Sequence, residues 1–132
     1  MQEIQVGLIG LGTVGCGLVK VLQDNEKLLE ERLGAPLKLK KVVDIDLERP
    51  RPIDLPREIL STEVESILED TEIHIVVELM GGMEPAKTFL LEAMKRGKHV
   101  VTANKALLAV HGGELFAAAK QNQVDMAFEG AV

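Results

Sequence analysis

Apolar runs alternate along the chain with segments of helical periodicity. The run IQVGLI over residues 4–9 predicts a strand. From Thr13 to Leu33, apolar residues recur at spacings of three, four and seven, which predicts one amphipathic helix. Gly34 and Pro36 then mark the end of that helix, because glycine suits a C-cap and proline cannot continue a helix.

The alternation continues to the end of the chain and indicates the fold class. The remaining pattern predicts strands at 37–43, 58–60, 73–79, 98–101 and 124–129, and helices at 62–69, 85–96 and 113–123. A capping box formed by Thr62 and Glu65 opens the first of these helices, and Gly97 closes the second. Continuous apolar strands between amphipathic helices are typical of a parallel sheet covered on both faces. We therefore expect an α/β fold of the Rossmann type, a doubly wound, mostly parallel sheet with helices on both faces.

Length and composition indicate a single folded domain over residues 1–132. The chain is 46% hydrophobic and 27% charged, and it contains no apolar run of the roughly 20 residues needed to cross a bilayer. A secretory signal has a basic region before its apolar stretch, and this chain has none there. The single cysteine, Cys16, suits a reducing compartment. We expect a cytoplasmic protein without a membrane partner.

Charge narrows the class of partner. The net charge is −6, with 21 acidic against 15 basic residues, which argues against a nucleic acid or an anionic membrane surface. The chain has no Trp, no Tyr and three Phe, too few aromatic side chains for a platform that stacks bases. The expected partner is therefore a small molecule.

Three glycines directly after the first strand form the most informative local motif. Gly10, Gly12 and Gly15 fit the pattern G-x-G-x-x-G, with a strand before them and a helix after them. In dinucleotide-binding proteins the first glycine allows a tight turn, the second lets a pyrophosphate approach the backbone, and the third lets the helix pack closely. The amides at the helix start then bind the anion. The alternative is a glycine-rich turn that merely packs well.

The end of the second strand bears on the choice of cofactor. A carboxylate at Asp44 would accept hydrogen bonds from the adenosine ribose and repel a 2′-phosphate. Arg49 and Arg51 follow closely and could instead pair with such a phosphate, and a solvated loop is a third interpretation. We favour NAD over NADP. For Cys16, at the start of the first helix, we favour a small buried side chain over a reactive thiolate.

Open α/β sheets bind ligands at the carboxyl ends of their strands, and three such ends carry unusual residues. They are Met80 with Gly81 and Gly82, the run Thr102-Ala103-Asn104-Lys105, and Glu129. Beside an oxidised nicotinamide, like charge and desolvation favour a neutral lysine amine, so Lys105 is the candidate catalytic base. The alternative is a surface lysine that begins the next helix. We interpret His74 and His99 as packing or capping residues, since no His/Cys cluster has metal-site spacing.

Four stretches resemble the amino-terminal domain of homoserine dehydrogenase. They are VGLIGLGTVG, VVELMGG, VVTANKALLA and FEGAV, of which the second and third are more specific than the glycine loop. The resemblance implies interconversion of homoserine and aspartate 4-semialdehyde by hydride transfer with NAD or NADP. It also implies a place in the synthesis of threonine, methionine and isoleucine.

The resemblance also implies roles for individual residues. The cofactor phosphates would lie on Gly10, Gly12, Thr13, Val14 and Gly15, and the nicotinamide half on Gly81, Gly82, Thr102 and Ala103. Lys105 would be one of two lysines implicated in proton transfer. Glu129 and the carbonyl of Val132 would be the first two ligands of a structural sodium ion.

The last residues of the chain indicate that it belongs to a longer protein. VDMAFEGAV runs from a strand into Gly130-Ala131-Val132 with no polar tail, which is unusual for a natural domain end. We expect a piece of a longer protein, a homodimer at full length, whose substrate-binding and catalytic domain is absent here. Cofactor binding is then expected of this chain, and turnover is not.

Two other classes of function remain open. One is another Rossmann oxidoreductase, such as an aspartate-semialdehyde or sugar dehydrogenase. The former needs a thiol nucleophile, and Cys16 lies at the phosphate end. The other is a non-catalytic dinucleotide sensor. Asn104 and Lys105 at the nicotinamide end favour an enzyme over a sensor.

Overall fold

Within residues 3–128, which the computed structural model describes, six parallel strands form one sheet with the order β3-β2-β1-β4-β5-β6. The strands are β1 (Ile4–Ile9), β2 (Leu37–Val43), β3 (Leu60–Ser61), β4 (Ile75–Glu78), β5 (His99–Thr102) and β6 (Met126–Phe128). This strand order is that of the dinucleotide-binding doubly wound fold, with β1 at its centre. The predicted fold class is therefore confirmed.

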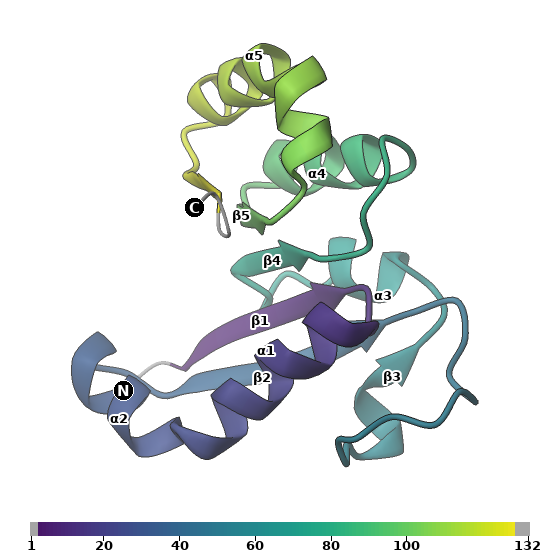
Figure 1. The fold of residues 1–132 in the computed structure, drawn as a ribbon. Helices are drawn as coiled ribbons and strands as arrows, with labels where there is room; N and C mark the ends of the chain where they lie inside the picture. Colours follow the sequence, from purple (N-terminus) through teal and green to yellow (C-terminus); the bar gives the residue numbers. More distant parts are fainter. Residues whose placement is uncertain (1–2, 129–132) are drawn as a thin grey trace.

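Helices cover both faces of the sheet. They are α1 (Thr13–Asp24), α2 (Glu26–Leu33), α3 (Glu65–Leu68), α4 (Ala86–Lys95) and α5 (Lys105–Gln121), with a 3₁₀ turn at Arg57–Ile59. Figure 1 shows α1 running across one face of β1 and β2, with α3 behind the sheet and α4 and α5 at the β5 end. The loop between β2 and β3 packs Ile53 and Leu55 onto the α1 side, where it takes the place of a helix.

Alternate residues of the central strands contribute to two separate cores. Leu8 and Val77 pack with Val19 of α1, whereas Ile9 and Val76 pack with helices α3, α4 and α5. Successive side chains of a strand point to opposite faces, so continuous apolar strands are what a sheet covered on both sides requires. None of the helices within residues 3–128 is long and apolar enough to span a membrane.

The helix predicted over residues 13–33 is in fact two helices. Asn25 separates α1 from α2, with φ −121° and ψ 25°. Its side-chain amide donates to the Val21 carbonyl at 2.9 Å, in competition with the regular helical ladder. Gly34 ends α2 in the left-handed conformation with φ 76°, as predicted.

Other element boundaries also differ from the predictions. The strand predicted at 58–60 is largely a 3₁₀ turn at Arg57–Ile59, and β3 follows it at Leu60–Ser61. The last helix begins at Lys105, not at residue 113, because Asn104 accepts a hydrogen bond from the Leu107 amide at 3.1 Å and so caps an earlier start. The capping box at Thr62 and Glu65 is wrong. Ser61 accepts from the Glu63 amide instead, and α3 begins at Glu65 without a side-chain cap.

Candidate functional site

The glycine loop joins β1 to α1 at the centre of the carboxyl edge of the sheet. β1 lies between β2 and β4, so the loop occupies the switch point at which open α/β sheets bind ligands. Gly10 has φ +104°, and a Cβ there would lie 2.7 Å from the Met80 nitrogen. Glycine is therefore needed at position 10 both for its backbone conformation and for the close approach of β4.

The other two glycines of the motif have opposite surroundings. A Cβ on Gly15 would overlap the carbonyl oxygen of Gly10, so the first turn of α1 packs directly on the loop. Gly12 has φ −86°, which any residue can adopt, and a Cβ there would meet no protein atom within 4 Å. The protein itself does not require glycine at position 12, and the open space fits a phosphate that lies against the main chain.

The amino terminus of α1 lacks a side-chain cap. Gly12 is its N-cap residue and has no side chain to accept from the first-turn amides, and Thr13 and Val14 are exposed. First-turn amides have no intrahelical acceptors, and the helix dipole adds partial positive charge to them. Residues 12–15 can therefore take an anionic group.

Asp44 at the end of β2 supports the loop from one side. One carboxylate oxygen accepts from the Leu11 amide at 2.7 Å, and the other accepts from the Asp46 amide at 3.0 Å. Burial by itself would raise the pKa of Asp44, but these two hydrogen bonds and the guanidinium groups of Arg51 and Arg49 hold the pKa below its ordinary value. Asp44 is thus an ionised support of the loop, and its contact with a ribose stays a prediction.

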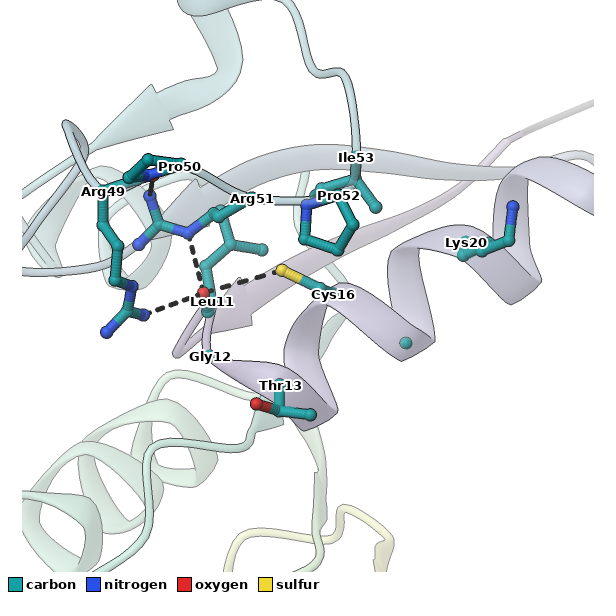
Figure 2. Close-up of a pocket in the computed structure, with 11 residues that line it drawn as sticks. Leu11, Gly12, Thr13, Cys16, Lys20, Arg49, Pro50, Arg51, Pro52 and Ile53 are labelled. Atoms are coloured by element: carbon teal, nitrogen blue, oxygen red, sulfur yellow. Dashed lines mark hydrogen bonds between the residues drawn. The ribbon is translucent and has the colours of Figure 1, made fainter.

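Two arginines on the same side of the loop bind the carbonyl group of Leu11. Arg51 donates to the Leu11 carbonyl at 2.8 Å and Arg49 donates to the same oxygen at 3.3 Å. Figure 2 shows both guanidinium groups and the Cys16 thiol converging on this oxygen. The Arg51 side chain is 9% exposed and donates in addition to the Asp46 and Arg49 carbonyls. The sequence did not indicate that Arg51 is committed to the main chain in this way.

A cleft opens on each side of the glycine loop. The larger has a volume of about 740 Å³ and lies between the loop and the carboxyl ends of β2, β3 and β4. Its walls include Gly10, Gly12, residues 44–46, residues 62–65, Met80 and Phe89. The smaller, of about 500 Å³, lies between α1 and residues 49–53 (Figure 2). The larger cleft has the size and the mixed polar and apolar walls of a small-molecule site.

The residues expected at the nicotinamide half lie at the neighbouring ends of β4 and β5. Gly81 and Gly82 are exposed, with φ +78° and +76°. Ala103 is half-buried, and Lys105 is the exposed first residue of α5. Thr102 is 0% exposed, so its side chain lies beneath this surface and does not line it. Their contact with a cofactor stays a prediction.

The sequence interpretation missed Glu78. This side chain is completely buried at the end of β4, and it accepts a hydrogen bond from the Thr102 hydroxyl at 2.6 Å. Glu78 and Thr102 are paired across the parallel strands β4 and β5. A charged residue that ends an apolar strand, IHIVVEL, is the signal that could have identified it.

The remaining candidates have structural roles or lie outside the described residues. The Cys16 thiol is buried, as predicted. His74 accepts from the Gln5 amide and His99 from the Asp125 amide, so both are capping residues, as predicted. Residues 3–128 hold no group of three His, Cys, Asp or Glu side chains able to bind a metal. The proposed sodium ligands Glu129 and Val132 lie beyond them.

Comparison with known families agrees with this geometry. A family model described as the NAD-binding domain of homoserine dehydrogenase matches residues 10–129. The chain belongs to the homoserine dehydrogenase family. The match contains the glycine loop, the ends of β2, β4 and β5, and the start of α5.

Individual members of the homoserine dehydrogenase family match nearly the whole chain. The protein from Bacillus subtilis is 49% identical over 132 residues, and that from Synechocystis is 46% identical over 131 residues. They cover 100% and 99% of this chain, which spans about 30% of the length of these curated relatives. The crystal structure of S. aureus homoserine dehydrogenase at pH 7.5 superposes with a TM-score of 0.92 at 39% identity, covering 99% of this chain and 34% of that one. For the Thiobacillus denitrificans enzyme the TM-score is 0.90 at 41% identity, with 100% and 30% covered.

The packing of α1 on the loop predicts opposite effects for two glycines of the same helix. Gly15→Ala should lower the free energy of unfolding by about 2 kcal/mol, because the new methyl overlaps a fixed carbonyl. Gly17→Ala should raise it by about 0.5–1 kcal/mol, because no protein atom lies near and alanine favours the helix. Urea denaturation measures both. Equal effects at the two positions would contradict the close packing at Gly15.

The environment of Asp44 predicts a pH-dependent contribution to stability. Because the pKa of Asp44 in the folded chain is below its ordinary value of 3.8, its contribution is complete above about pH 5 and is lost as pH falls through the lower folded pKa. Asp44→Asn should therefore lower the free energy of unfolding by about 1–2 kcal/mol at pH 7, with the deficit shrinking in acid. Asp24→Asn, at an exposed helix end, is the matched control and should change stability little. A deficit independent of pH would contradict the ionised support.

Proposed function

We propose that the chain is the cofactor-binding domain of a homoserine dehydrogenase and binds a nicotinamide adenine dinucleotide across the carboxyl edge of its sheet. The open space at Gly12 carries this proposal, since neither backbone conformation nor protein packing requires glycine there. The uncapped start of α1 supports it, because an anion can take the free amides. Membership of the homoserine dehydrogenase family supplies the chemistry of the whole enzyme.

The two clefts and strand ends suggest how the cofactor lies. The diphosphate would contact residues 12–15, and the adenosine half would enter the cleft of about 740 Å³ beside Asp44. The nicotinamide half would lie toward Gly81, Gly82 and Ala103, at the carboxyl ends of β4 and β5. We place the two halves in this direction because of the strand order. The crevice at the switch point runs along the carboxyl ends of β2, β1, β4 and β5, so a cofactor with its adenosine at β2 has its nicotinamide at β4 and β5.

The electrostatics of the adenosine end favour NAD over NADP. Asp44 and Asp46 both line the larger cleft, and two carboxylates there would repel a 2′-phosphate. Arg51 is occupied by three main-chain carbonyls and by Asp44, so its guanidinium is not free to pair with that phosphate. Arg49 also lines this cleft, remains exposed and bonds a single carbonyl. Four carboxylates on the same walls, those of Asp44, Asp46, Glu63 and Glu65, outnumber this one guanidinium. The balance of charge therefore supports NAD.

Alcohol oxidation needs a hydride acceptor, which the bound cofactor supplies, and a base for the hydroxyl proton. Lys105 begins α5 with an exposed side chain next to the end of β5, where it can take that proton. The catalysed reaction would be the interconversion of homoserine and aspartate 4-semialdehyde. Because the relatives are about three times longer, we propose that the residues binding the substrate lie outside this chain and that it does not turn over homoserine alone.

Three further features of the full-length protein belong to the same proposal and rest on family resemblance. They are a structural sodium ion at Glu129 and Val132, a homodimer, and a cytoplasmic location.

Cofactor binding is tested at Gly12. We expect the chain to bind NADH in calorimetric titration, and NADPH more weakly because of Asp44 and Asp46. Gly12→Ala should weaken NADH binding by about tenfold or more, because its methyl fills the phosphate space, while thermal unfolding stays unchanged. Gly17→Ala, whose methyl also meets no protein atom, is the control and should bind NADH normally. Absence of NADH binding at millimolar concentration would refute the proposal.

The role of Lys105 is tested in a full-length enzyme that carries this chain. Lys105→Ala should lower kcat by about 100-fold or more, while the Kd for NADH changes little, since a general base acts mainly in the transition state. Lys120→Ala, an exposed lysine in the last turn of the same helix, is the control. Unchanged turnover in Lys105→Ala would remove this residue from the reaction.

A further inference from the structure

A buried carboxylate underlies the turn that follows β4. The Glu78 side chain is 0% exposed, and one of its oxygens accepts from the amides of Met80 and Gly81, both at 3.0 Å. Its other oxygen accepts from the Thr102 hydroxyl at 2.6 Å. Glu78 thus holds the main chain of the exposed glycine turn from below and ties it to β5.

The hydrogen bonds continue from Thr102 to the start of α5. The Thr102 hydroxyl oxygen accepts from the Asn104 amide at 3.0 Å. The Asn104 side chain donates to the Gly82 carbonyl at 2.5 Å and accepts from the Leu107 amide at 3.1 Å. The chain of contacts therefore closes on itself, since it leaves the glycine turn at Gly81 and returns to it at Gly82.

No basic side chain within residues 3–128 forms an ion pair with Glu78. Its oxygens are satisfied by two amides and one hydroxyl, all neutral donors. A buried carboxylate without a cation is unfavourable for stability compared with an apolar side chain of similar volume. A contribution to stability therefore does not explain why a glutamate is buried at position 78. Its hydrogen bonds fix the main chain of the exposed glycine turn, and this role does explain it.

We propose that Glu78 is a positioning residue for the nicotinamide half of the cofactor site. It orients Met80 and Gly81 directly. Through Thr102 and Asn104 it also reaches Gly82 and sets the first turn of α5, which carries Lys105. This inference rests on the proposed cofactor function. The adenosine half of the proposed site is fixed by different contacts, those of Asp44 and Arg51 with Leu11. Loss of Glu78 should therefore weaken binding of the nicotinamide and leave binding of the adenosine half unchanged.

The test compares two ligands that differ in the nicotinamide. NADH has the complete nicotinamide half, whereas ADP-ribose has the adenosine, the diphosphate and the second ribose but lacks the nicotinamide ring. Glu78→Gln keeps the shape but replaces one acceptor oxygen by an amide group that cannot accept a hydrogen bond. We expect this variant to bind NADH about tenfold more weakly and ADP-ribose within about twofold of the unaltered chain.

Two substitutions at Thr102 give an independent comparison. Thr102→Ser keeps the hydroxyl that joins Glu78 to Asn104 and should bind NADH normally. Thr102→Val has the same shape without the hydroxyl and should show the NADH-selective loss of Glu78→Gln. This pair decides the question if Glu78→Gln does not fold, and thermal unfolding of each variant identifies that case.

Each outcome gives a decision. Selective loss of NADH binding supports the positioning role. An equal loss for NADH and ADP-ribose would show a merely structural role, and no loss for either would show no role, so both overturn the inference. If the unaltered chain binds ADP-ribose and NADH equally well, the nicotinamide ring adds no binding energy here and only the inference fails. If it binds neither ligand, the proposed function itself fails.

Discussion

The site depends on the close contact of three main-chain segments where β1 turns into α1. Gly10 lies against the start of the turn after β4, and Gly15 brings the first turn of α1 onto the Gly10 carbonyl. A side chain at either position would separate these segments, because protein interiors leave no room for an extra methyl group. The contact places the amino terminus of α1 directly over the carboxyl edge of the sheet, where its amides can act on a ligand.

Two polar clusters, one half-buried and one buried, hold the main chain on the two sides of this contact. On the β2 side, Asp44 and Arg51 bind the amide and the carbonyl of Leu11. On the β5 side, Glu78 acts with Thr102 and Asn104 on the turn at residues 80–82. In both clusters charged or polar side chains satisfy main-chain groups, and the loops of a ligand site gain their shape from such fixed supports.

Two sides of different chemistry, with an open space between them, fit a ligand with two unlike halves joined by a diphosphate. Gly12 leaves space at the middle, the proposed adenosine side has an apolar and acidic cleft, and the other side presents bare main chain. The similarity to homoserine dehydrogenases spans all of these parts, while covering about a third of those proteins. The proposed cofactor domain therefore corresponds to about a third of these relatives in extent, and we place the substrate-binding residues outside it.

The amino-acid sequence by itself determined the alternation of strands and helices, the parallel sheet and the position of the glycine loop, because these follow from local periodicity and from glycine's backbone freedom. It did not determine the break at Asn25 or the start of α5 at Lys105, since single side-chain hydrogen bonds to nearby backbone groups decide those boundaries. Only the tertiary structure showed that Arg51 donates a hydrogen bond to the Leu11 carbonyl and that Glu78 accepts one from the Thr102 hydroxyl. These partners lie far apart in the chain and come together through strand order and register, which local patterns do not encode.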